Sequence, residues 1–395
     1  MSAAQHAPLP PSAAARWGGQ CAASAALEAR YADFGADTHA SAREWGDAAH
    51  WLAAGCLRAD GIPSRGAIGE TATPNGVVID DEMVEAVDLY VSDVLAKLAE
   101  VGVSLADCHI ESRLDPTGII HPDNWGTADL WVFVWRGPTA GLLLLWDFKG
   151  GHRFVDAYLN WQLINYAALI LGRKEFAHLD HRQVQVVMTV VQPRNYAPVG
   201  PVRRWATTAV DLAGYWQDLR DAAAEARGPS PRTQVGPECA DCKGRHICPA
   251  LARAADSAAD VAGDAAPVEL PPDALGIELR ILRRAKDLLD ARVDGLETQA
   301  LALIKAGKSI PFFKAEASQG REWWSGDTAE VIALGAALGL SIAKPPTPIT
   351  PGQARKAGMD AAIVAAYSAR TPGAVKIVPA DSAVAAKVFT ATPGA

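Results

Sequence analysis

An acid and a base stand two positions apart at the end of an apolar run, in Asp147-x-Lys149. Alternate side chains of a strand point to the same face, so Asp147 and Lys149 are expected to lie side by side. A second acid, Asp129, opens another apolar run. If Asp129–Trp135 pairs with Leu142–Phe148 as a hairpin, two carboxylates and one ammonium group meet in one cleft.

Such a cleft suits a divalent metal ion and a water molecule. Paired carboxylates are ligands that Mg²⁺ and Mn²⁺ prefer, and a bound ion lowers the pKa of water and shields a phosphodiester. Lys149 would position the water or stabilise transition-state charge. The alternative is structural, with two acids that cap turns beside an exposed lysine. We predict that Asp129, Asp147 and Lys149 are catalytic.

Three further polar side chains are placed to serve the same cleft. His50 falls in an amphipathic helical stretch, and its neutral imidazole would join Asp129 and Asp147 as a third metal ligand. Gln162 and Tyr166 are one turn apart on one helical face, where their amide and hydroxyl would bind phosphate oxygens or a base edge. Taken alone, His50 also fits a structural histidine, and Gln162 with Tyr166 fits a polar surface pair.

Three of the six cysteines are crowded into one stretch, as Cys239, Cys242 and Cys248, and the lone Cys21 precedes them. Six cysteines in a cytosolic chain of this size do not indicate a disulfide framework. Four thiolates suit an iron–sulfur cluster. The spacing also matches a zinc site that His246 or Cys21 would complete, so both metals stay open.

Hydrophobic periodicity predicts the elements that must position these residues. Their order predicts an α/β domain with a mixed sheet flanked by helices. The predicted strands cover residues 107–114, 128–135, 141–148 and 183–191, and the predicted helices cover most of 13–61, then 80–101, 156–171 and 210–227.

The two ends of the chain differ from this domain in composition. We expect residues 1–12 to be disordered and residues 254–271, rich in Ala, Asp and Pro, to be a linker. The intervening residues 13–253 form one domain. A long helix over 272–306 begins a mainly helical region that extends to residue 395, with a possible strand at 312–316 and two short helices.

The bulk composition limits the classes of function. A formal net charge of −8 argues against a protein that coats nucleic acid by charge alone. Residues 147–204 nevertheless hold eight Lys and Arg against four acids, which leaves room for a local basic groove. No apolar run reaches membrane-spanning length and no signal peptide opens the chain, so we expect a cytoplasmic protein without a membrane partner.

The order of these motifs resembles the PD-(D/E)XK nucleases, and more narrowly their RecB-type exonuclease branch. Glu111 stands where that branch often carries a further acid. One departure is that no glutamate follows His50 within the next turn. The motifs that carry the resemblance are His50, Gly126-x-x-Asp129, Asp147-x-Lys149 and Gln162-x-x-x-Tyr166.

The resemblance implies a restriction-endonuclease-like core and Mg²⁺- or Mn²⁺-dependent, exonuclease-like hydrolysis of linear DNA. The layout of one cysteine followed by three is similar to iron–sulfur nucleases of the AddB type and of CRISPR adaptation. That similarity implies a [4Fe–4S] cluster that ties the N-terminal segment to the end of the domain, with Zn²⁺ as the alternative. The implied ligands are Cys21, Cys239, Cys242 and Cys248.

The whole chain also resembles a family of uncharacterised phage and prophage proteins assigned to this nuclease superfamily. Trp17-x3-Cys21 and a Gly320-Arg-Glu-Trp-Trp segment carry this second resemblance. It implies work in phage DNA replication or recombination, with other phage proteins as partners in the bacterial cytoplasm. A second hypothesis is a DNA-binding or assembly protein that uses a nuclease-like scaffold and acts through a partner.

Overall fold

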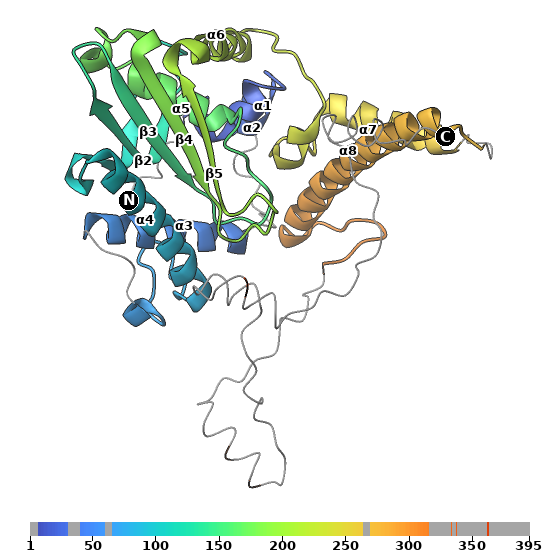
Figure 1. Ribbon diagram of the computed structural model, residues 1–395. Helices are drawn as coiled ribbons and strands as arrows, with labels where there is room; N and C mark the ends of the chain where they lie inside the picture. Colours follow the sequence, from blue (N-terminus) through green and yellow to red (C-terminus); the bar gives the residue numbers. More distant parts are fainter. Residues whose placement is uncertain are drawn as a thin grey trace, which may run out of the picture. The chain divides into compact units, whose positions relative to one another are not determined.

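The computed structural model describes residues 7–30, 40–59, 65–263 and 269–315, together with the single positions 333, 337 and 362. The chain divides into two units, Met1–Glu316 and Ala317–Ala395. The elements below belong to the first unit and are drawn as ribbons in Figure 1. No helix among the described residues is long and apolar enough to cross a membrane. The helices are α1 (Ala14–Trp17), α2 (Ser24–Arg30), α3 (Ala40–Arg58), α4 (Asp81–Val101), α5 (Trp161–Leu171), α6 (Ala209–Ala226), α7 (Pro249–Gly263) and α8 (Pro272–Lys305), with short 3-10 turns η1 (Pro11–Ala13), η2 (Arg65–Ala67), η3 (Leu105–Asp107), η4 (Lys174–Phe176), η5 (His181–Gln183) and η6 (Pro237–Asp241).

The predicted mixed sheet is confirmed. Its strands lie in the order β1-β2-β3-β4-β5, and only the β3–β4 pair is parallel. That parallel pair requires a crossover, which α5 supplies. The strands are β1 (His109–Leu114), β2 (Gly126–Trp135), β3 (Gly141–Phe148), β4 (Val184–Val191) and β5 (Val202–Thr208).

The fifth strand, β5, was not predicted. It pairs antiparallel with β4 at the edge of the sheet. Its sequence carries two arginines and two threonines, and only Arg203 is buried. A half-exposed edge strand of this kind lacks the apolar alternation on which the prediction relied.

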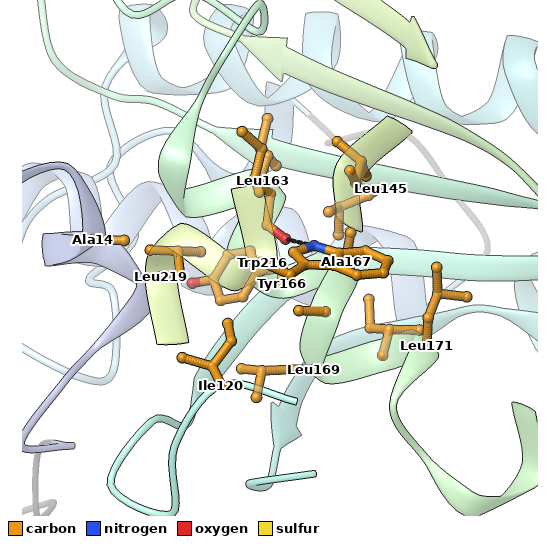
Figure 2. Close-up of a cluster of buried hydrophobic side chains, with 14 of the residues drawn as sticks. Ala14, Ile120, Leu145, Leu163, Tyr166, Ala167, Leu169, Leu171, Trp216 and Leu219 are labelled. Atoms are coloured by element: carbon orange, nitrogen blue, oxygen red, sulfur yellow. Dashed lines mark hydrogen bonds between the residues drawn. The ribbon is translucent and has the colours of Figure 1, made fainter. Parts of the chain in front are cut away.

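Helices cover both faces of the sheet (Figure 1). Leu144 and Trp146 of β3 pack in a core cluster with α3 and α4, whereas Leu143 and Leu145 pack in a second cluster with α5 and α6. Figure 2 shows part of the second cluster, where the indole N–H of Trp216 donates to the backbone carbonyl of residue 164 at 3.0 Å. Strand β3 is therefore buried on both faces, as a central strand of a covered sheet must be.

Helix caps decide where α4 and α5 begin. The Asp80 carboxylate accepts the backbone N–H of Met83 at 2.7 Å and caps α4, whose end Gly102 takes a left-handed φ of 71°. The Asn160 side chain caps α5 by accepting the N–H of Gln162 at 3.0 Å. This cap starts α5 at Trp161, five residues later than predicted from periodicity, and it fixes Gln162 in the first turn.

The expectation that residues 1–12 are disordered is wrong for residues 7–12. Leu9 is fully buried, its N–H donates to the carbonyl of Asp123 at 3.1 Å, and its carbonyl accepts the Asn124 amide at 2.7 Å. The indole of Trp17 donates to the Pro10 carbonyl at 2.9 Å. Tertiary contacts therefore order this Pro-rich segment; residues 1–6 lie outside the described residues.

The expected linker at 254–271 is wrong for residues 254–263, and residues 264–268 lie outside the described residues. Helix α7 continues to Gly263 and packs beside α8 (Figure 1). Leu251 and Ala255 bury one face of α7. The alanines that look like low complexity are strong helix formers, so the segment remains helical where it has a packing partner.

The long helix predicted over 272–306 is confirmed as α8, but the strand predicted at 312–316 is not. Only an isolated bridge joins Ile310 to Phe313, and Phe312 is fully exposed with a left-handed φ of 69°. The short helices predicted further on, and the segment around Gly320, lie outside the described residues.

Candidate active site and cysteine site

Asp129 and Asp147 occupy opposed positions on neighbouring strands. The pairing of β2 with β3 ends at Leu130↔Trp146, so Asp129 and Asp147 are the next opposed positions of the same register. Directly opposed residues on antiparallel strands have Cβ atoms about 5 Å apart. The hairpin predicted from sequence therefore brings the ends of the two strands together, and the Asp129 carboxylate accepts the backbone N–H of Phe148, the residue after Asp147, at 2.7 Å.

Glu111 of β1 adds a third acid on the other side of Asp129. Ile110 and Ser112 are both paired with β2, whereas Glu111, which stands opposite Asp129, has a φ of 45° and no ladder partner in the described sheet. A non-glycine residue in the left-handed region costs about 1–3 kcal/mol, and such strain concentrates at functional sites.

This interruption also breaks the alternation of β2. Ala128 and Leu130 are two positions apart and should share a face, yet Ala128 packs with the α5 side and Leu130 with the α3 side. Asp129 lies between these two residues, where the side chains of β2 change the face of the sheet to which they point. The distortion explains how its side chain reaches His50 of α3 while its neighbour Asp147 faces α5.

His50, Glu111 and Asp129 form a compact group. The Nδ1 atom of His50 lies 3.4 Å from Oε1 of Glu111 and 3.5 Å from Oδ1 of Asp129. One ligand atom from each residue lies within 4.8 Å of the others. The second Asp129 oxygen accepts the backbone N–H of Phe148 at 2.7 Å, which fixes the carboxylate and leaves Oδ1 toward His50.

The charges of this group set the protonation of His50. Burial lowers the pKa of His50, but the charge of Asp129 and the hydrogen bond and charge of Glu111 outweigh it and raise the pKa to about 9. At neutral pH the ring is therefore an imidazolium that offsets part of the acidic charge. A cation that binds Nδ1 must displace that proton.

A second group of hydrogen bonds surrounds Asp147. The ammonium of Lys149 lies 3.0 Å from both Asp147 oxygens and donates to Oε1 of Gln162 at 2.9 Å. The Gln162 amide donates to Oδ1 of Asp147 at 3.0 Å and to the Tyr166 hydroxyl at 3.2 Å. Tyr166 in turn donates to the Thr127 carbonyl at 2.6 Å. Gln162 and Tyr166, which we expected to orient DNA, therefore hold Asp147 and Lys149 in place.

Burial dominates the titration of this second group. Burial raises the pKa of Asp147, the charge of Lys149 lowers it and the charge of Asp129 raises it. The net pKa of Asp147 is about 6. For Lys149, burial lowers the pKa, but the carboxylates of Asp147 and Asp129 prevail and raise it. The Lys149 side chain is 27% exposed against 2% for Asp147, so the ammonium is the part of the pair that solvent and a ligand reach.

The donor set fits a hard divalent cation. Oδ2 of Asp147 is buried and, beyond its 3.0 Å ion pair with Lys149, has no hydrogen-bond partner among the described residues. Carboxylate oxygens and an imidazole nitrogen suit Mg²⁺ or Mn²⁺. Of the predicted ligands His50, Asp129 and Asp147, the first two gather with Glu111, and Asp147 stands opposite Asp129 beside them.

Tyr90 of α4 is a residue that the sequence analysis missed. Its ring stacks on Phe148 at 4.9 Å between centroids, and its buried hydroxyl has no hydrogen-bond partner in the described part of the chain. Burial, followed by the charges of Asp129 and Glu111, raises its pKa well above the usual value. Its position on the apolar face of an amphipathic helix could have drawn attention to Tyr90 in the sequence, because a buried tyrosine hydroxyl needs a hydrogen-bond partner.

The four predicted cluster cysteines line one cavity. All four are buried free thiols. Cys21 follows α1, whereas Cys239, Cys242 and Cys248 lie in and after η6, before α7. The structure therefore brings the lone N-terminal cysteine to the three at the end of the domain.

Hydrogen bonds tie the two segments together around this cavity. Oε1 of Gln20 accepts the backbone N–H of Glu238 at 3.1 Å, and its amide lies 3.7 Å from Sγ of Cys239. The N–H of Ala23 donates to the Arg232 carbonyl at 3.1 Å. The N-terminal segment is thus held to the cysteine loop by hydrogen bonds to its backbone as well as by a contact with sulfur.

Backbone amides also point at the sulfur atoms. The N–H groups of Gln234 and Gly236 lie 3.4 Å from Sγ of Cys21 and Cys239, respectively. Burial raises the pKa of Cys239, and it raises that of Cys242 to about 12. Thiolates here therefore require a positively charged group between them, and amide donors to sulfur are typical of iron–sulfur sites.

The spacing of the sulfur atoms bears on which group fits. Thiolates on one zinc ion, with Zn–S bonds of about 2.3 Å, lie about 3.8 Å apart. No three of the four sulfur atoms lie within 4.8 Å of one another. His246, the other candidate zinc ligand, is not among the described residues that line the cavity, and its Nδ1 contacts the Lys243 carbonyl at 3.1 Å. Cys21, which lines the cavity with the other three cysteines, is therefore the better candidate than His246 for a fourth zinc ligand.

The fold and site together define an α/β protein with a buried acidic site and a separate four-cysteine site. A family model described as protein of unknown function (DUF2800) matches residues 6–380. The chain therefore belongs to this family. A search of curated proteins finds no match.

Proposed function

We propose that this chain is a Mg²⁺- or Mn²⁺-dependent deoxyribonuclease of the PD-(D/E)XK class with an exonuclease-like action. The observation that carries the proposal is the meeting of Asp129 and Asp147 at opposed strand positions, with Lys149 bound to Asp147 and Gln162. A surface ion pair would not need a buried carboxylate held by two side chains. The described topology, with three antiparallel strands and one parallel crossover through α5, supports this class.

Each group of side chains at the site would have its own role in the reaction. His50, Asp129, Glu111 and Asp147 would hold the divalent cation, which supplies an activated water and shields phosphate charge. Lys149, the exposed member of its pair, orients the attacking water and donates to the phosphate oxygens as charge develops. Gln162 and Tyr166 fix the angle of the Asp147–Lys149 pair.

The proposal includes a [4Fe–4S] cluster on Cys21, Cys239, Cys242 and Cys248. The shared cavity and the amide donors to sulfur support it, and the resemblance to iron–sulfur nucleases favours the cluster over zinc. The cluster would tie the two ends of the domain and carry no step of the hydrolysis. The resemblance to phage and prophage proteins supports a place in phage DNA replication or recombination, with phage proteins as partners in the host cytoplasm.

The test is degradation of linear single- and double-stranded DNA by anaerobically purified protein with Mg²⁺, Mn²⁺ or a chelator. We expect cation-dependent cleavage that Asp129→Asn removes. Asp93→Asn is the matched control, because Asp93 is a half-buried acid that pairs with Trp146 and Arg204 outside the site. Binding of DNA without cleavage under every condition would instead favour a scaffold that acts through a partner.

A further inference from the structure

Helix α8 carries leucines at a spacing of seven residues. The positions four residues after them are also apolar, except for one lysine. This is the a/d pattern of a coiled coil, in which leucine at d with a β-branched residue such as Val293 at a favours two parallel strands, and a single polar a residue sets the register. The d positions are Leu275, Leu282, Leu289, Leu296 and Leu303, and the a positions are Leu279, Lys286, Val293 and Ala300.

Much of this a/d seam is open to solvent. Leu275, Leu282, Val293 and Leu296 are 43–55% exposed, and the other apolar seam residues are half-buried. Single exposed leucines are ordinary, but a continuous apolar stripe along one helix indicates a binding surface.

The rest of the first unit packs most closely against α8 at heptad positions other than a and d. Ala291 and Gly295, at f and c, are buried, and a Cβ on Gly295 would lie 2.9 Å from the backbone nitrogen of His246. Arg292 donates to the His246 carbonyl through Nη1. Packing of α8 beside the cysteine loop therefore leaves much of the a/d seam exposed.

The charges that flank the seam match a second copy in parallel register. In such a dimer, the g residue of one helix meets the e residue five positions later on its partner. Glu278 (g) would meet Arg283 (e), and Arg292 (g) would meet Glu297 (e), each as an opposite-charge pair. Arg292 donates to the loop carbonyls of Arg245 and His246 through Nη1, and its guanidinium has further donors. At the a position, the Lys286 ammonium forms a 2.5 Å ion pair with Asp290 at e, which places the ammonium at the edge of the a/d seam.

We propose that this chain forms a homodimer through a parallel, in-register coiled coil of α8, Pro272–Lys305. The helix spans more than four heptads, enough for a stable pair. This inference does not depend on the proposed nuclease function.

The test is the mass of the full-length protein by light scattering and sedimentation across a concentration series. We expect twice the monomer mass, and a monomer for Leu282→Glu/Leu296→Glu, with dimer affinity weakened by about 100-fold or more because two charges enter an apolar seam. The matched control is Ile277→Glu/Ile281→Glu, which charges two residues that are 55% and 58% exposed but lie at f and c. This control should remain dimeric.

A charge swap tests orientation. Glu278→Arg should weaken the dimer by placing like charges at g and e, and Glu278→Arg/Arg283→Glu should restore it. A monomeric wild type, with the seam covered by residues beyond 316 or left bare, would overturn the proposal. Equal loss of dimer in the seam and control variants, or no restoration by the double swap, would overturn it too.

Discussion

The ammonium of Lys149 lies 3.0 Å from both carboxylate oxygens of Asp147, at the buried end of β3. The two side chains leave the same face of one strand, as their spacing of two residues requires. Gln162, from the crossover helix, contacts both partners and so determines their relative angle. The pair is therefore fixed by the fold before any ligand arrives, which is what a catalytic group needs.

Replacement of Gln162 by leucine should shift the pH dependence of cleavage. Asp147 must be ionised, and burial has already raised its pKa to about 6, so the wild-type rate should fall as pH drops through about 6. Gln162→Leu removes a donor to the carboxylate and raises that pKa further, so the acid limb should move to higher pH. The pH–rate profile of kcat/KM checks this, and an unchanged acid limb would remove Gln162 from the role of holding Asp147.

Binding of Mn²⁺ should release a proton from His50. The imidazole has a pKa of about 9 in the described structure, so it is protonated at pH 7.5, and a cation on Nδ1 must displace the proton. Affinity should therefore rise with pH up to about 9. Calorimetry in two buffers of different ionisation enthalpy measures the release. His50→Gln should abolish it, and equal release in the variant would show that His50 is not a ligand.

At position 111, the glycine variant should be at least as stable as the alanine variant, which reverses the usual order in a strand. In an ordinary strand, glycine is about 0.5–1 kcal/mol less stable than alanine. At a φ of 45°, alanine pays about 1–2 kcal/mol that glycine avoids. Glu111→Gly should therefore be at least as stable as Glu111→Ala in urea unfolding, while both weaken Mn²⁺ binding. A clear advantage for alanine would contradict the strained backbone.

Loss of one cluster cysteine should affect both iron content and stability. Cys21→Ser should lose most iron and the brown colour of the anaerobic protein, and its Tm should fall by about 10 °C because the ligand no longer stabilises the folded state. Cys56→Ser and Cys108→Ser are matched controls, since both cysteines lie outside the cavity. One zinc per chain in a colourless wild type would replace the cluster with the zinc alternative.

The central strands could be predicted because burial dictates their composition. Strand β3 is buried throughout and apolar up to Asp147, and its pairing with β2 follows from a short connection. Strand β5 and helix α7 could not be predicted in the same way. The polar sequence of β5 makes sense only at a sheet edge, and the alanines of α7 depend on α8 for packing.

The same distinction holds at the site. Alternation in a strand predicts the neighbourhood of Asp147 and Lys149, and helical spacing predicts that of Gln162 and Tyr166. The reach of Glu111 toward His50 depends on a left-handed residue inside β1, which periodicity does not report. The meeting of Cys21 with the distant cysteines is a long-range contact that came from family resemblance.

The central claim is that Asp147 and Lys149 perform cation-dependent hydrolysis of DNA. The most direct measurement is the single-turnover rate of cleavage of end-labelled linear DNA with Mg²⁺ for wild type, Asp147→Ala and Lys149→Ala, with folding monitored by circular dichroism. We predict cation-dependent cleavage by the wild type and a loss of about 10³-fold or more in each folded variant. Cleavage at the wild-type rate by both folded variants would contradict the assignment.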